Sequence, residues 1–136
     1  MRKVLYAQAV YNWREIWAVA KSLWSNSFLS VGPLSAKFES EVAKLFNKKY
    51  GVFVNSGSSA NLLVVQLIPK GEVITPALTF ATTLTPLLQA GLTPVFVDSE
   101  INTFLPTIES IEAKITDKTT AVMIPNLLGN KIDSKR

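Results

Sequence analysis

Hydrophobic residues recur at helical spacing in the first third of the chain. They lie three or four positions apart between Asn12 and Trp24, and again between Leu34 and Asn47, as expected for one face of a helix. The sequence therefore predicts two amphipathic helices joined by a linker that ends near Pro33. The first helix carries three tryptophans on or near one face, which favours packing in a core or a subunit interface over a ligand platform. These are Trp13, Trp17 and Trp24.

Beyond residue 49 the chain alternates short apolar runs with helical segments. Short, nearly continuous apolar runs are typical of parallel strands that are buried on both faces. The alternation predicts an α/β fold, with a mostly parallel sheet and helices on both of its faces. The expected strands are Tyr50–Asn55, Glu72–Thr75, Pro94–Asp98 and Thr120–Pro125, and the expected helices are Ser59–Leu67, Thr79–Gln89 and Ile108–Lys114.

Small polar residues follow the first expected strand, where the chain reads Ser-Gly-Ser-Ser over residues 56–59. The start of a helix has unpaired N–H groups and partial positive charge, so it favours a bound anion such as phosphate. Gly57 lets the backbone approach the anion closely, while Ser58 and Ser59 add hydroxyl donors or cap the helix. Taken in isolation, the same four residues more often form only an N-cap and a turn.

Composition narrows the chemistry that the chain can carry. The 136 residues are 48% hydrophobic and 18% charged, which suits a folded domain. Without cysteine or histidine, the chain has no disulfide, no zinc site of the usual ligands and no serine–histidine triad. The net charge is +4, but the basic residues are scattered, so nucleic-acid binding is not expected. No apolar run is long enough to span a membrane, and we expect a cytoplasmic protein.

Six parts of the chain follow one another in a characteristic order. They are Gly32–Leu34 with Phe38–Glu39, Val54–Leu63, Gly71–Phe80, Gly91–Asp98, Ile108–Ile115 with Asp117–Thr119, and Leu128–Asn130. In this order they resemble the DegT/DnrJ/EryC1/StrS family of pyridoxal-phosphate-dependent sugar aminotransferases and dehydratases. The segments around residues 56–63 and 128–130 are most similar to the branch of nucleotide-linked 4-keto-6-deoxyhexose 3-dehydratases and their close aminotransferase relatives.

The resemblance implies a fold and a domain organisation. The fold would be the large domain of a fold type I, aspartate-aminotransferase-like enzyme, here incomplete. Residues 1–33 would form an N-terminal helix and linker. Residues 34–136 would form the N-terminal part of the large domain that binds pyridoxal 5′-phosphate, and the remainder and the small domain would be absent.

The resemblance also implies roles for individual residues. Gly57, Ser58 and Ser59 would hold the cofactor phosphate, and Phe80 would stack on the pyridine ring. We interpret Asp98 as structural, capping the next turn, because the family's partner for the pyridinium nitrogen resembles an aspartate on a later strand. Asn126 stands near a position where relatives often carry histidine, and a supporting role there stays open.

The implied function is that of an enzyme of deoxysugar and aminosugar synthesis, including lipopolysaccharide, acting as a homodimer on a nucleotide-linked 4-ketohexose. Such enzymes use a catalytic lysine, or a histidine in the 3-dehydratases. No lysine of this chain matches that position, so we assign no catalytic residue and expect a truncated chain that is inactive alone. Two alternatives stay open: another fold type I enzyme such as a lyase, and a non-catalytic module that binds phosphate or a partner.

Overall fold

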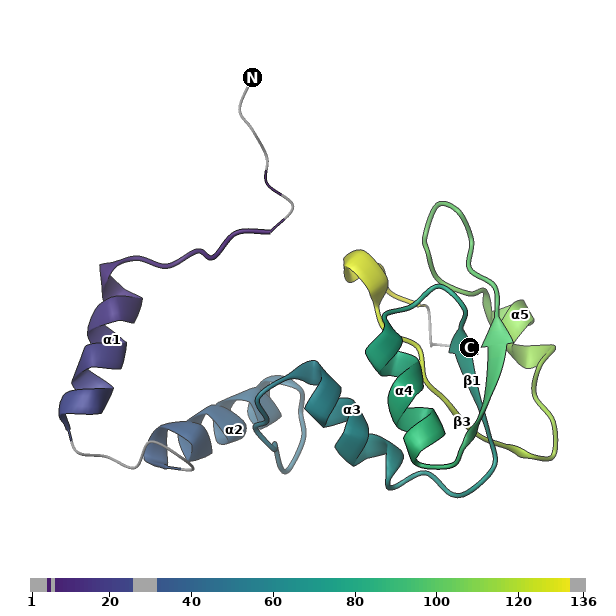
Figure 1. The fold of residues 1–136 in the computed structure, drawn as a ribbon, viewed down its shortest axis with the longest axis horizontal. Helices are drawn as coiled ribbons and strands as arrows, with labels where there is room; N and C mark the ends of the chain where they lie inside the picture. The colour runs from purple at the N-terminus through teal and green to yellow at the C-terminus, as the bar shows by residue number, and fades with distance from the viewer. Residues whose placement is uncertain (1–4, 6, 26–31, 133–136) are drawn as a thin grey trace. The chain divides into compact units, whose positions relative to one another are not determined.

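The computed structural model describes residues 5, 7–25 and 32–132, which form parts of two compact units (Figure 1). The first unit, Met1–Phe53, contains helices α1 (Trp13–Trp24) and α2 (Pro33–Leu45). Both helices expected from hydrophobic spacing are therefore present. The expected linker lies mainly outside the described residues, and the domain boundary expected after residue 33 stays a prediction.

Helix α1 starts at a capping box. The Asn12 side chain accepts a hydrogen bond from the Arg14 N–H at 2.9 Å, and Glu15 Oε2 accepts one from the Asn12 N–H at 2.7 Å. These two bonds pair N–H groups that the helix itself leaves without acceptors. No α1 residue is buried within the described part of the unit, so the expected packing partner of its tryptophan face stays a prediction.

The expected strand at Tyr50–Asn55 was wrong. In the structure this segment is extended but belongs to no sheet. The Phe53 N–H donates to Glu39 Oε1 at 2.8 Å, and the Phe53 ring meets the edge of Phe38 on α2, with ring centroids 5.2 Å apart. A strand needs a hydrogen-bonded neighbour as well as an apolar sequence, and no described residue supplies one here.

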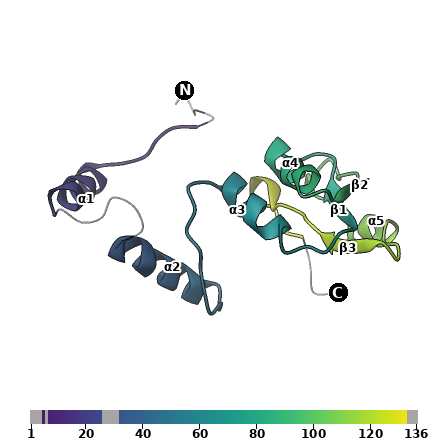
Figure 2. The same ribbon diagram turned by 60° about the horizontal axis from the view of Figure 1, so that its bottom comes forward.

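The second unit, Val54–Arg136, contains a three-stranded parallel sheet in the order β2-β1-β3 (Figure 2). Its strands and helices alternate along the chain as the apolar pattern predicted. Its elements are α3 (Gly57–Val65), β1 (Glu72–Pro76), α4 (Ala81–Gln89), β2 (Thr93–Val97), α5 (Ile108–Glu112), β3 (Thr119–Val122) and the 3₁₀ turn η1 (Leu127–Gly129).

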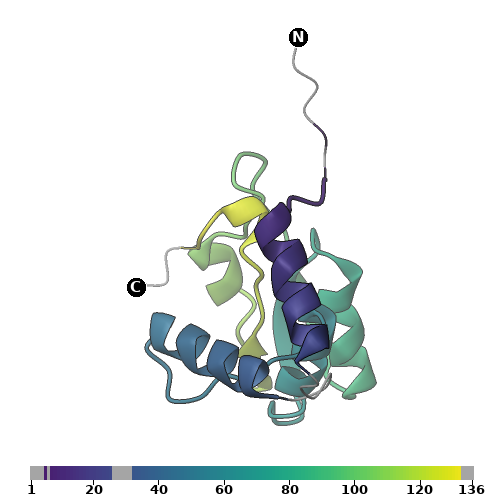
Figure 3. The ribbon, with the colours of Figure 1, turned by 90° about the vertical axis from the view of Figure 1, so that its left-hand side faces the viewer.

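Two apolar clusters cover opposite faces of the sheet. Val73 of β1 packs with Val65 of α3 and Leu87 of α4, whereas the next residue, Ile74, packs with Ile111 of α5. The change of face between neighbouring residues follows from the alternation of side chains along a strand. Figure 3 shows α4 and α5 on opposite sides of the strands. The predicted coverage of both faces is confirmed.

Helix α4 ends in a Schellman motif at Gly91. The Leu92 N–H donates to the Leu87 carbonyl at 2.9 Å and the Gly91 N–H to the Leu88 carbonyl at 3.0 Å. Gly91 has φ of +67°, a conformation that glycine adopts without steric cost. The turn directs Leu92 into the core and the chain into β2.

Within the described residues, no helix is both long and apolar enough to cross a membrane.

The capping box predicts a pH dependence for α1. The hydrogen bond from the Asn12 N–H lowers the pKa of the Glu15 carboxyl below its ordinary value of 4.5. A carboxyl whose pKa is lowered by folding stabilises the helix above 4.5, and this contribution is lost as pH falls through the folded-state pKa. In NMR titrations, we expect the Asn12 amide proton to shift with a midpoint below pH 4.5. Glu15→Gln should abolish that transition, and a midpoint at or above 4.5 would contradict the assignment.

Candidate functional site

The start of α3 is organised by three polar side chains. Ser56 is the N-cap, and its hydroxyl accepts a hydrogen bond from the Ser59 N–H at 3.2 Å. The Ser59 hydroxyl donates to Asn55 Oδ1 at 2.6 Å. The first helical bond runs from the Ala60 N–H to the Ser56 carbonyl. The predicted helix start is therefore present, two residues earlier than expected.

The same arrangement leaves anion-binding groups available. Among the described residues, the N–H groups of Gly57 and Ser58 have no acceptor, and the Ser58 hydroxyl has no partner. A Cβ built on Gly57 would meet no atom within 4 Å. Free N–H groups at the start of a helix, beside open space, are the donor set that a phosphate requires. Ser59 differs from Ser58 because its N–H and hydroxyl already serve the cap.

A second group lies at the start of α4. Phe80 is the N-cap residue of α4, and its side chain is 72% exposed. Behind it, the Thr79 hydroxyl donates to the hydroxyl of the buried Thr83 at 3.0 Å. In Figure 1, α4 begins beside the end of the sheet at which β1 points. A hydrogen bond of 3.0 Å from Asn61 Nδ2 of α3 to the Thr82 carbonyl of α4 brings the early turns of the two helices close together.

Three other strand-end residues have separate environments. The Asp98 carboxylate accepts a hydrogen bond from the N–H of the adjacent Ser99 at 2.8 Å, and its expected structural role in capping the following turn stays a prediction. Asn126 precedes η1 without a side-chain cap, and its supporting role stays a prediction. Sequence reasoning missed Thr75, which is fully buried on β1 with a hydroxyl that finds no partner among the described residues. In the sequence it is one more residue of a β-branched run.

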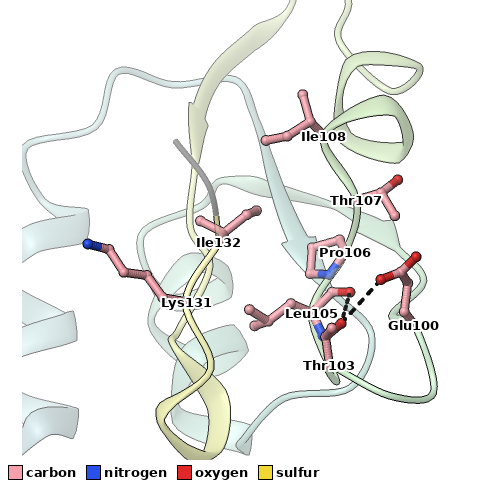
Figure 4. Close-up of a pocket in the computed structure, with 8 residues that line it drawn as sticks. All are labelled: Glu100, Thr103, Leu105, Pro106, Thr107, Ile108, Lys131 and Ile132. Carbon is pink, nitrogen blue, oxygen red and sulfur yellow. Dashed lines mark hydrogen bonds between the residues drawn. The ribbon is translucent and has the colours of Figure 1, made fainter. Parts of the chain in front are cut away.

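A recess of about 180 Å³ lies between the loop after β2 and the segment after η1 (Figure 4). None of the sequence-predicted site residues lines it. The Asn130 side chain donates to the Thr103 carbonyl at 2.7 Å and holds these two segments together. Lys131 extends away from Glu100 in this view. The lining residues are Glu100, Thr103, Leu105, Pro106, Thr107, Ile108, Lys131 and Ile132.

Comparisons with known proteins give matches that extend over most of the chain. The model of the DegT/DnrJ/EryC1/StrS aminotransferase family matches residues 11–136. The GDP-4-keto-6-deoxy-D-mannose 3-dehydratase of Escherichia coli O55:H7 is 38% identical over 135 residues, 92% of this chain and 35% of that protein. The dTDP-4-dehydro-2,6-dideoxy-D-glucose 3-dehydratase of Saccharopolyspora spinosa is 42% identical over 113 residues, 75% of this chain and 24% of that protein.

A solved structure supports the same likeness. The E. coli GDP-4-keto-6-deoxy-D-mannose-3-dehydratase with bound hydrated PLP matches with a TM-score of 0.77 at 38% identity. The match covers 85% of this chain and 32% of that chain. In each of these matches the chain therefore spans about a third or less of the length of the matched protein.

The cap at α3 predicts a difference between two neighbouring serines. Ser56→Ala removes the acceptor of the Ser59 N–H and should lower the free energy of unfolding by about 1 kcal/mol. Ser58→Ala removes a hydroxyl that has no partner in the described residues and should change it by less than about 0.5 kcal/mol. Urea denaturation of both variants measures the difference. Equal losses would show that Ser56 does not act as the cap.

Proposed function

The chain belongs to the DegT/DnrJ/EryC1/StrS aminotransferase family, and we propose that it supplies the phosphate-binding part of a pyridoxal-phosphate-dependent enzyme. The proposed enzyme is a sugar aminotransferase or dehydratase that acts on a nucleotide-linked 4-ketohexose in deoxysugar and aminosugar synthesis. The names of the two curated relatives, both 3-dehydratases of nucleotide-linked sugars, support this substrate class.

One observation carries the proposal. The N–H groups of Gly57 and Ser58 are unpaired among the described residues, and the space that a Gly57 Cβ would fill is open. These residues fit a phosphate monoester, which takes several hydrogen bonds and is stabilised by the positive end of a helix. Gly57 and Ser58 would donate their N–H groups, and Ser58 its hydroxyl. Ser59 would donate its hydroxyl by exchanging Asn55 for a phosphate oxygen.

Phe80 is the second proposed contact. Its exposed ring, at the start of α4, offers an apolar face for a planar heterocycle. Stacking would fix the plane of the cofactor ring, while the phosphate contacts fix one end of it. When bound, pyridoxal phosphate supplies an electron sink for breaking bonds next to a substrate amine carbon. The residues of this chain bind and orient, and we assign none of them a proton transfer.

Assembly and location complete the proposal. We propose that the protein is cytoplasmic and forms a homodimer. The dimer is proposed because the apolar face of α1 has no partner in the described part of its unit. Exposed tryptophans are frequent in subunit interfaces. The absence of a membrane-crossing helix among the described residues is consistent with this location.

Gly57→Ala tests the phosphate site. Its methyl group meets no atom within 4 Å in the structure, and alanine favours helix, so thermal stability should be unchanged or slightly higher. Binding of pyridoxine 5′-phosphate should weaken by about tenfold, because the methyl group occupies space needed by the anion. Pyridoxine 5′-phosphate has no aldehyde and cannot condense with surface lysines. Calorimetric titration measures the affinity, with Gln66→Ala at the other end of α3 as control. An unchanged affinity would refute the site.

Phe80→Ala tests the ring contact separately. Aromatic pairs contribute about 0.5–1.5 kcal/mol beyond burial, so the original chain should bind pyridoxine 5′-phosphate about 3- to 10-fold more tightly than inorganic phosphate. Phe80→Ala should remove this ratio and leave the affinity for inorganic phosphate unchanged. If the ratio survives the substitution, Phe80 does not stack on the ring.

A further inference from the structure

Helix α4 contains an interior proline that leaves one carbonyl without a helical partner. In an α-helix the carbonyl of residue i accepts the N–H of residue i+4. The residue four positions after Thr82 is Pro86, which lies inside α4 and has no N–H. The Thr82 carbonyl therefore needs a hydrogen-bond donor from elsewhere, because an unpaired carbonyl away from water costs free energy.

Asn61 supplies that bond. Its Nδ2 donates to the Thr82 carbonyl at 3.0 Å in a partly buried position. Asn61 lies on α3, one turn beyond Gly57 and Ser58, and Thr82 lies in the first turn of α4. Within the described residues this is the one side-chain hydrogen bond between the two helices. The proline thus exposes an acceptor at the point where α3 can reach α4.

The bond restricts a motion that apolar packing leaves free. The helices α3 and α4 pack against each other, and Val65 and Leu87 meet in one cluster. The hydrophobic effect that drives this packing is non-directional, so it sets the relative position of the two helices less precisely than a directional bond does. A hydrogen bond is directional and fixes both the axial position and the rotation of the first turn of α4. Phe80 immediately precedes that turn.

We propose that Asn61 is a positioning residue that holds Phe80 at a fixed place relative to the phosphate-binding start of α3, using the carbonyl that Pro86 leaves unpaired. Asn61 itself need not touch the cofactor. The inference rests on the proposed function of Gly57, Ser58 and Phe80. According to this inference, Asn61 and Pro86 together fix the position of Phe80 relative to the phosphate-binding residues Gly57 and Ser58.

The first test uses Asn61→Leu, which keeps the branched shape and the number of heavy atoms of the side chain but removes its donor. In the full 136-residue chain, titrations with inorganic phosphate and with pyridoxine 5′-phosphate report the phosphate contacts and the ring contact separately. Asn61→Leu should change phosphate affinity by less than about twofold and remove most of the 3- to 10-fold preference for the ring compound. In a Phe80→Ala background, Asn61→Leu should have no further effect on that preference.

The matched control is Asn130→Leu. Asn130 also donates from Nδ2 to a backbone carbonyl, that of Thr103, but in the loop after β2. Its substitution should leave the preference for pyridoxine 5′-phosphate intact. Loss of the preference in both variants would show a general effect of removing such bonds and would overturn the inference.

A double variant separates positioning from a merely structural role. Asn61→Leu combined with Pro86→Ala returns an N–H to the Thr82 carbonyl within α4. We expect the thermal midpoint to recover while the preference for the ring compound stays lost. If the thermal midpoint and the preference for the ring compound both recover, Asn61 only pairs with the Thr82 carbonyl and has no positioning role, which would overturn the inference. The double variant also decides the matter if Asn61→Leu alone does not fold.

A ligand-free measurement distinguishes failure of this inference from failure of the proposed function. The chain has no cysteine, so spin labels at Leu63→Cys on α3 and Leu88→Cys on α4, both exposed, report one distance. Asn61→Leu should shift or broaden its distribution, and an unchanged distribution would overturn the role of Asn61. If the distribution changes but the original chain shows no preference for pyridoxine 5′-phosphate, the proposed role of Phe80 fails while the hold of Asn61 on the helices stands.

Discussion

The parallel pairing of β1 on both of its edges is the constraint on which the second unit depends. Thr75 pairs with Phe96 of β2, and Ile74 pairs with Val122 of β3. A parallel register brings the carboxyl ends of neighbouring strands to the same edge of the sheet. The pairing continues past β1, where the Ala77 N–H donates to the Val97 carbonyl at 2.9 Å. The loop that leads to Phe80 is therefore anchored beside the end of β2.

An apolar sequence that lacks such pairing does not become a strand. Residues 50–55 contain β-branched and aromatic residues of the kind favoured in strands, but the Phe53 N–H pairs with the Glu39 carboxylate. Local sequence sets which side chains are apolar, whereas a strand is defined by bonds to residues distant in the chain.

The predictable parts of the molecule are those decided by local patterns. Hydrophobic spacing located α1 and α2, and continuous apolar runs located β1 and β2, with ends shifted by one or two residues. The candidate site was predictable as a place, because small polar residues follow a run and precede a helix. The division of labour between Ser58 and Ser59 was not, since it depends on which hydroxyl reaches Asn55 after folding. The sequence around Thr75 gives no signal that its hydroxyl finds no partner in the described part of the chain.

Pro86 is an exception to the rule that proline is excluded from helix interiors, and it bears on how α3 and α4 are held together. Proline costs a helix interior about 3 kcal/mol in general, yet the apolar pattern already predicted a helix across Pro86, over Thr79–Gln89. The helix nevertheless continues to Gln89, Pro86 is buried within it, and Asn61 pairs with the Thr82 carbonyl, which Pro86 leaves without its helical partner. Such a proline is tolerated where a neighbouring element supplies a hydrogen-bond donor to the carbonyl that lacks its helical partner. The position of α4 is thus specified by α3 through a polar contact, and not by apolar packing alone.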